Sequence, residues 1–178
     1  MKIIFSLFIA LFLFTFAGSS NLYAQKEHRN LTIILLRHAE KDASPSADKV
    51  NPELSADGKL RAARLVKIVN KYKPDAIFSS DFIRTRETVA PLALKRKLNV
   101  QIYDHRNLKA LADLIMSGKI KRLLIVGHNT TTPALVNMLI GAEKYKMLAE
   151  TEYDKIFVVK IKRRKTKPNK IKEKVITY

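Results

Sequence analysis

Two arginines and two histidines are the residues of this 178-residue sequence best suited to chemistry, because each lies shortly after an expected strand. They are Arg37, His38, Arg84 and His128. Arginine binds an oxyanion through two N–H groups at once, and histidine donates a proton or attacks as a nucleophile according to its protonation state. One histidine after a strand is usually only a hydrogen-bonded loop residue. Two of them beside two arginines would form an oxyanion site, provided that the fold brings all four together.

The apolar runs are the strands that must position these residues. They alternate with longer stretches of helical pattern, which is the βαβα order of an α/β domain. The runs are "LTIILL", "AIFSS", "VQIY" and "RLLIVG", and the helical stretches are 54–72, 81–97 and 107–117. Strands as apolar as the first and the last of these lie in the middle of a parallel sheet that is covered on both faces. We therefore expect a three-layer α/β sandwich with a mainly parallel central sheet, helices on both faces and a C-terminal β-hairpin.

The ends of these strands predict where the polar residues meet. In open α/β sheets, ligands bind beyond the carboxyl ends of the strands. Arg37 and His38 stand at such an end, and so do His128 and Asp104, which follows "VQIY". We therefore expect these four side chains at one edge of the sheet.

Arg84 is expected to reach the same edge from the start of a helix. Asp81 is the expected N-cap of that helix, which places Arg84 in its first turn. A cation in the first turn opposes the helix dipole, and a bound anion would compensate it. The sequence thus predicts an oxyanion site. No group of residues has the spacing of metal ligands, so we expect neither a metal nor another cofactor.

The N-terminal residues 1–24 have the pattern of a secretory signal peptide. Lys2 precedes a run of fifteen mostly apolar residues, and Ala24 is a small residue at a suitable cleavage point. The run is shorter than the ~20 residues of a spanning helix, and an uncleaved membrane anchor is the alternative. We expect a periplasmic or secreted protein in which residues 25–178 form a single domain. The chain has no cysteine, which excludes disulfides and a cysteine nucleophile.

The C-terminal segment 156–178 is expected to form the hairpin, because β-branched and aromatic residues flank the turn residues "TKPN". The chain has a formal net charge of +18, and residues 160–178 carry nine Lys or Arg against one Glu. Lysines at a sheet edge discourage unwanted strand pairing, and contact with an anionic lipid or polysaccharide surface is the other interpretation. Motifs for specific nucleic-acid binding are absent, so we expect no such partner. The sequence leaves the oligomeric state open.

Three segments resemble the signatures of one family, the histidine phosphatase or phosphoglycerate mutase-like superfamily. "LLRHAEK" resembles its Arg-His-Gly-Glu signature with Ala39 in the glycine position. "SSDFIRTRET" is similar to the segment with its second arginine, and "VGHNT" is similar to the segment with its second histidine. Order and spacing agree over residues 31–162, and the short length resembles the compact SixA-like branch.

The resemblance implies a metal-independent phosphatase in which His38 attacks phosphorus and forms a phosphohistidine that water hydrolyses. It implies that Arg37, Arg84 and His128 bind the phosphoryl oxygens, over which the transition state spreads negative charge. His38 must then be neutral at the attacking nitrogen. The expected substrate is a phosphorylated small molecule or a phosphoprotein. A non-catalytic phosphate- or polyanion-binding protein on the same fold is the alternative.

The proton donor for the leaving group is the open part of this mechanism. The segment after the third strand lacks the glutamate-bearing insertion of the larger mutases, so mutase activity is not expected. Asp104 is the first candidate, because burial at the strand end would raise the pKa of its carboxyl group. A capping role in a turn is the alternative for this residue. Glu150, Glu152 and Asp154 are the further candidates.

Overall fold

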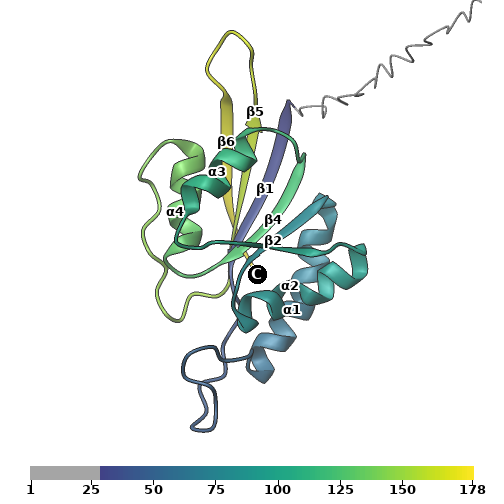
Figure 1. The fold of residues 1–178 in the computed structure, drawn as a ribbon, viewed down its shortest axis with the longest axis vertical. Helices are drawn as coiled ribbons and strands as arrows, with labels where there is room; N and C mark the ends of the chain where they lie inside the picture. The colour runs from purple at the N-terminus through teal and green to yellow at the C-terminus, as the bar shows by residue number, and fades with distance from the viewer. Residues whose placement is uncertain (1–28) are drawn as a thin grey trace, which may run out of the picture.

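The computed structural model describes residues 29–178, so the expected signal peptide lies outside the described residues. These residues form a six-stranded sheet in the order β3-β2-β4-β1-β5-β6 (Figure 1). The strands are β1 (Asn30–Arg37), β2 (Ala76–Ser80), β3 (Val100–Tyr103), β4 (Arg122–Gly127), β5 (Lys155–Lys162) and β6 (Lys170–Thr177). The helices are α1 (Ala56–Val69), α2 (Ile83–Arg96), α3 (Leu108–Met116) and α4 (Thr131–Ile140), with a 3₁₀ turn η1 (Asn70–Tyr72) after α1. In this part of the chain no helix is long and apolar enough to cross a membrane.

The sheet is parallel in its centre and antiparallel at one side. Strand β4 pairs in parallel with β1 and β2, and β2 pairs in parallel with β3. Strand β5 runs antiparallel to β1, and β6 runs antiparallel to β5 as the C-terminal hairpin. The two most apolar runs, β1 and β4, are the two central strands. The expected sheet and hairpin are confirmed.

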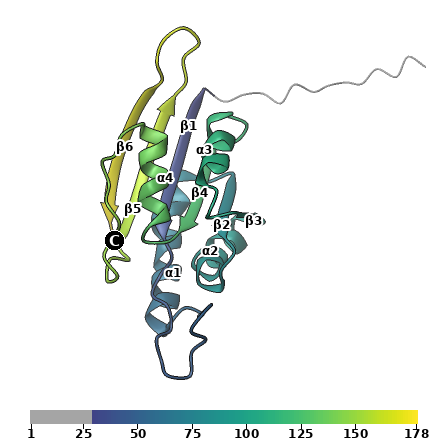
Figure 2. The same cartoon turned by 60° about the vertical axis from the view of Figure 1, so that its left-hand side comes forward.

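Helices cover both faces of the sheet, because alternate residues of the central strands are buried on opposite sides. Ile33 and Leu35 of β1 belong to the hydrophobic cluster that includes α3 and α4. Ile34 and Leu36 belong to the cluster that includes α1 and α2. Each such side chain contributes about 1.5–3 kcal/mol by its burial. The molecule is therefore the expected three-layer sandwich, with helices on both sides of the sheet (Figure 2).

At one end of the sheet, the carboxyl ends of the parallel strands lie beside the amino end of the antiparallel strand β5. The carboxyl ends of β1 and β4 lie side by side there, with Arg37 opposite Gly127. The ends of β2 and β3 follow, with Ser80 opposite Tyr103. The antiparallel strand β5 begins at this edge, because Leu36 at the end of β1 lies opposite Ile156. The start of β1 and the hairpin tip lie at the opposite end in both views (Figures 1 and 2).

Two local details differ from the sequence interpretation. The N-cap of α2 is Phe82 and makes no side-chain capping bond, whereas Asp81 forms an ion pair with Arg86. The expected N-cap role of Asp81 was therefore wrong. Helix α4 was not predicted at all, since its sequence "TTPALVNMLI" is almost wholly apolar and shows no polar face. It packs with most of its residues buried, as helices without a polar face do.

Candidate active site

His38 follows β1 as a buried histidine with a defined tautomer. Its side chain is 3% exposed, and its backbone N–H donates to the Gly127 carbonyl at 3.0 Å. The ring Nδ1 lies 2.7 Å from the carbonyl oxygen of Ala39. A carbonyl only accepts, so Nδ1 carries the proton and Nε2 keeps its lone pair. Burial lowers the pKa of His38 from 6.5 to about 3, and nearby cationic groups add to this effect. The imidazole is therefore neutral at pH 7, as a nucleophile requires.

Ala39 occupies the position at which the family signature has glycine. Its side chain is fully buried against Leu54 and Ala62, and its N–H donates to the Thr88 hydroxyl at 2.9 Å. The residue is not among those with a positive φ, so the backbone needs no glycine here. Alanine therefore leaves the geometry of the preceding His38 intact.

His128 lies beside His38, with ring centroids 5.4 Å apart. Its Nε2 is 2.9 Å from the Ser80 hydroxyl, which fixes the ring from the end of β2. Burial, followed by the charge of Arg84, lowers the pKa of His128 from 6.5 to about 4. The free site therefore holds a neutral His128. Its expected role as a protonated donor requires a bound anion, whose charge would raise this pKa.

Gly127, the last residue of β4, leaves room for two hydroxyl groups that approach it closely. A Cβ at this position would lie 2.7 Å from the Thr131 hydroxyl and 2.8 Å from the Tyr103 hydroxyl. The Thr131 hydroxyl accepts the His128 N–H at 2.9 Å, so a side chain at Gly127 would disturb the start of α4. Glycine is therefore required here by close approach.

Arg37 is only 2% exposed and is largely occupied by the loop before β5. Its Nη1 donates to the carbonyls of Ala149 at 2.8 Å and Glu150 at 3.0 Å. Its Nη2 donates to the Glu150 carboxylate at 2.9 Å, and the guanidinium lies over the Tyr153 ring at 4.1 Å. Only Nε is buried without a partner. Arg37 therefore cannot bind an oxyanion through two N–H groups at once in this arrangement. Its Nε–H is the group that is left to donate a hydrogen bond.

Arg84 lies in the first turn of α2, as expected, with its guanidinium 4.4 Å from the Phe82 ring centre. Its Nε and Nη1 are buried without a hydrogen-bond partner. Within residues 29–178 it forms no ion pair, and burial together with the neighbouring Arg37 lowers its pKa. A buried N–H group without a partner is costly, so such groups usually await a ligand or water. The two arginines thus present three unpaired N–H groups beside two neutral histidines.

These four residues, Arg37, His38, Arg84 and His128, form what we call the histidine–arginine cluster. The charges of Arg37 and Arg84 both act on His38 and His128 in lowering their pKa values, which places all four within electrostatic reach of one another. The sequence interpretation predicted this convergence. The arrangement suits a tetrahedral oxyanion held by guanidinium N–H groups next to the free Nε2 of His38.

Asp104 is not buried, although burial was the reason for expecting it to be the proton donor. Its side chain is half exposed, and it accepts hydrogen bonds from the backbone and side chain of Arg106. These bonds lower the pKa of Asp104, the opposite of the shift that a protonated donor needs. The expectation of a buried, protonated Asp104 was wrong, and the turn role that was its alternative fits the structure.

Two residues near the cluster were missed by the sequence interpretation. The ring of His105 lies 5.7 Å from that of His128 and 5.2 Å from that of Phe82. The ring of Tyr153 lies 6.1 Å from that of His38. His105 directly follows Asp104, which the sequence analysis did select. The same position after β3 could therefore have indicated His105 as a site residue. No pattern in the sequence indicated Tyr153, because it precedes a strand rather than following one.

The other acid candidates lie in the loop before β5. Glu150 binds Arg37 and also accepts a hydrogen bond from the Asn129 amide at 2.8 Å. Glu152 pairs with Lys155, and this bond lowers the pKa of Glu152. The loop therefore brings Glu150 to the cluster and holds Glu152 as an anion. Throughout residues 29–178, no three His, Cys, Asp or Glu side chains form a group that could hold a metal ion.

Comparison with known proteins agrees with this geometry. Residues 33–109, which contain His38, Arg84 and His105, match the model of the histidine phosphatase superfamily (branch 1). Over these residues the chain is similar to the histidine phosphatase superfamily. No curated protein sequence matches it.

Solved structures of low sequence identity share the fold of this chain. The mycobacterial glucosyl-3-phosphoglycerate phosphatase in complex with inorganic phosphate is 15% identical, with a TM-score of 0.59 over 85% of this chain and 97% of that chain. The protein histidine phosphatase SixA complexed with tungstate is 13% identical, with a TM-score of 0.59 over 83% and 97%. A protein proposed to be the phosphohistidine phosphatase SixA of Agrobacterium tumefaciens is 22% identical, with a TM-score of 0.55 over 72% and 90%.

Proposed function

We propose that this protein is a histidine phosphatase that hydrolyses phosphomonoesters or phosphohistidine, without a metal, through a phosphohistidine intermediate on His38. One observation carries the proposal: a buried, neutral His38 with a free Nε2 lies within electrostatic reach of Arg37 and Arg84, whose guanidinium groups hold three buried nitrogen atoms without a partner. Two structures of the same fold hold inorganic phosphate or tungstate, which are tetrahedral oxyanions. These ligands support an oxyanion as the species that the cluster receives.

The chemistry follows from the positions of these groups. Nε2 of His38 attacks phosphorus while the bond from phosphorus to the leaving oxygen breaks, and that oxygen takes up a proton. Water then attacks the phosphohistidine, which releases inorganic phosphate and restores neutral His38. Arg84 offers two N–H groups and Arg37 one, so the charge on the phosphoryl oxygens meets fixed donors in both steps.

We propose His105, rather than Asp104, as the donor of the proton to the leaving oxygen. The loop after β3 brings the His105 ring next to His128, whereas the Asp104 carboxyl is occupied by Arg106. A proton donor contributes roughly 10²–10⁴ in rate for an alkoxide leaving group and little for nitrophenolate, which leaves without a proton. We therefore expect His105→Gln to slow hydrolysis of an alkyl phosphate far more than hydrolysis of p-nitrophenyl phosphate.

Asp104→Asn is the matched control for this test, because the two residues are neighbours in one loop. Rates for both esters should change little in the Asp104→Asn protein. An equal loss on both esters in His105→Gln would make His105 a residue that positions His128. A selective loss in Asp104→Asn would return the role to Asp104.

A trapping experiment tests the proposed intermediate. Protein of residues 25–178 is mixed with a labelled phosphomonoester in excess EDTA and quenched in acid or in base. A phosphoramidate is labile in acid, so label should survive only the alkaline quench, and His38→Ala should trap none. His38→Ala should also lower turnover by more than roughly 10³-fold, as loss of a nucleophile does. Turnover that needs added zinc or magnesium would contradict the metal-free mechanism.

The non-catalytic alternative predicts a different result. A phosphate sensor on this fold would bind inorganic phosphate and show no turnover of any ester in a panel of phosphomonoesters. The presence of both histidines and both arginines favours the enzyme, since a sensor does not need a nucleophile with a free Nε2.

We propose that the enzyme works in the periplasm or outside the cell, on the basis of the signal-peptide pattern in residues 1–24. N-terminal sequencing of protein isolated from its host should give a chain that begins near Gln25. An intact Met1 in the membrane fraction would support the anchor instead.

A further inference from the structure

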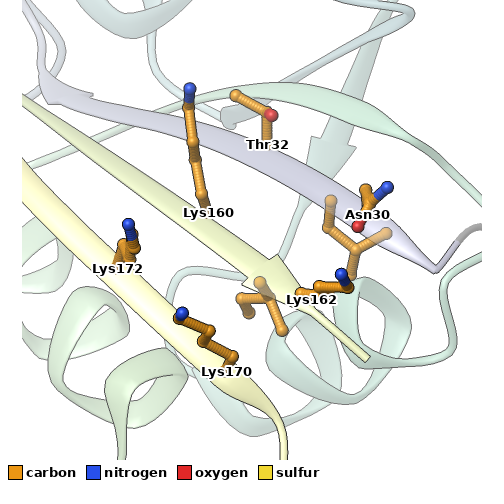
Figure 3. Close-up of a pocket in the computed structure, with 8 residues that line it drawn as sticks. Asn30, Thr32, Lys160, Lys162, Lys170 and Lys172 are labelled. Atoms are coloured by element: carbon orange, nitrogen blue, oxygen red, sulfur yellow. The ribbon is translucent and has the colours of Figure 1, made fainter. Parts of the chain in front are cut away.

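Four lysines project from one face of the C-terminal hairpin (Figure 3). They are Lys160 and Lys162 of β5 and Lys170 and Lys172 of β6, which we call the lysine face. Lys160 lies directly opposite Lys172, and Lys162 lies directly opposite Lys170. The surface continues over the start of β1, which contributes Asn30 and Thr32.

Protection of a sheet edge does not explain the lysine face. Of the two hairpin strands only β6 lies at an edge of the sheet, whereas β5 pairs with β1 on its other side. Lys160 and Lys162 therefore sit on an internal strand, where strand pairing is already complete. Like charges directly opposite each other in a sheet are destabilising. Within residues 29–178, none of the four lysines forms an ion pair, so the repulsion has no internal compensation.

The helices leave this part of the sheet uncovered. Farther along the same face, Val158 and Ile156 are buried in the cluster that includes α1 and α2. Lys160 and Lys162 continue the same alternation of β5 but are exposed. The lysine face therefore lines a pocket that is widely open to solvent rather than enclosed. Such a shape fits an extended anionic surface better than a small anion that must be enclosed.

The surrounding residues extend the positive charge. The hairpin turn adds Arg164, Lys165 and Lys167, all exposed. The single acidic residue of the hairpin strand β6, Glu173, points to the other face and pairs with Lys144. The hairpin tip over residues 162–170 thus carries only positive charge.

We propose that the lysine face binds the surface of an anionic lipid bilayer. The chain enters the domain at this end, since β1 starts at Asn30 beside the lysines. The apolar segment 3–17 precedes the domain by only residues 18–29, so a retained segment would hold the membrane close to this end. Lysines near a charged bilayer each add to the attraction. The residues of this surface include no aromatic side chain for stacking bases, which disfavours single-stranded nucleic acid.

The consequence is a defined orientation on the membrane. The histidine–arginine cluster lies at the carboxyl end of β1, and the lysine face flanks its amino end. A protein bound through its lysines therefore keeps its active site turned away from the lipid, open to substrates in solution.

Vesicle co-sedimentation tests the proposal with residues 25–178, which contain every strand, helix and hydrophobic cluster of the described domain. Vesicles of phosphatidylcholine alone are compared with vesicles that also contain phosphatidylglycerol. We expect binding only to the anionic vesicles and weaker binding as salt is raised. The variant with Lys160, Lys162, Lys170 and Lys172 all changed to Gln should bind at least roughly tenfold more weakly.

A control variant of equal net charge carries Gln at four exposed lysines elsewhere. These are Lys59, Lys95, Lys109 and Lys146. It should keep its binding to anionic vesicles, and both variants should keep phosphatase activity and melting temperature. Equal loss of binding in the two variants would show that net charge alone is responsible and would overturn the proposal. So would heparin that binds the parent more tightly than the vesicles do, since a soluble polyanion would then be the partner.

Discussion

The two cationic regions of this protein lie at opposite ends of the same strands and differ in how their charges are held. At the carboxyl end of β1, Arg37 is 2% exposed and touches backbone carbonyls, a carboxylate and an aromatic ring. At the amino end, the lysine face is exposed to solvent and has no partner among the described residues. The difference is one of solvation rather than of charge.

This difference determines what each region is able to do. Burial fixes the donors of the histidine–arginine cluster before a ligand arrives, and fixed donors in a low-dielectric site stabilise a transition state most effectively. Solvated lysines keep their rotamer freedom and attract anions over about a Debye length without selecting among them closely. Chemistry is therefore expected at one end and surface attachment at the other.

The largest effect of this difference between buried and solvated cations is expected at Arg84. Its buried Nε and Nη1 have no partner in the free protein, so Arg84→Met should raise the free energy of unfolding by about 1 kcal/mol. The same change removes the donors that we propose for the phosphoryl oxygens and should lower kcat/KM by roughly 10²–10³. Urea unfolding and steady-state kinetics measure the two effects.

Arg37→Met is the comparison for that variant. Arg37 holds the loop before β5 through Ala149 and Glu150, so its loss should lower stability as well as activity. If Arg84→Met were destabilised as strongly as Arg37→Met, the guanidinium group of Arg84 would stabilise the fold. It would then not be a group that lacks a partner until an anion binds.

Most of the fold was predictable because its signals are local. The strand runs and the α1, α2 and α3 stretches show their periodicity within a few turns, and carboxyl strand ends of a parallel sheet share one edge by topology. This is why His38, Arg84 and His128 were brought together correctly. Helix α4 lacks the polar face that reveals a helix in sequence, and so it was missed.

The parts that failed depend on tertiary structure. Tyr153 reaches the cluster because β5 is antiparallel, so its amino end lies among the carboxyl ends of its neighbours. The choice between Asp104 and His105 depends on a single turn. The Asp104 carboxylate accepts the Arg106 N–H at 3.0 Å, which is the turn bond that aspartate favours, and the next residue then lies against His128.

The buried histidines predict a loss of stability in mild acid. His38 and His128 have pKa values of about 3 and about 4 in the folded protein, against 6.5 for their ordinary value. Between about pH 4 and pH 6.5 the unfolded chain therefore binds up to two more protons, and the free energy of unfolding falls as pH falls. The slope should approach about 2.7 kcal/mol per pH unit, twice the value for one proton. Urea unfolding from pH 7 to pH 5 measures it.

His128→Gln separates this effect from general acid denaturation. The variant should lose about half of the slope above pH 5, where carboxylates contribute little. An unchanged slope in His128→Gln would mean that His128 is protonated in the folded protein and that the cluster is more solvated than its burial indicates.

The smallest expected effect lies at the lysine face, where charge repulsion is solvated and weak. Lys172→Glu places a carboxylate directly opposite Lys160 and replaces a repulsive pair by an attractive one. Cross-strand pairs of this kind are worth roughly 0.2–1 kcal/mol, so the free energy of unfolding should rise by that amount at low salt and return toward the parent value at high salt.

Lys174→Glu is the matched control, because Lys174 is exposed on the same strand but lies opposite Val158. An equal gain in both variants would assign the effect to net charge, whereas a gain confined to Lys172→Glu would show that the lysines are paired at a cost in stability. Phosphatase activity should be unchanged in both variants, since the histidine–arginine cluster lies at the other end of the strands.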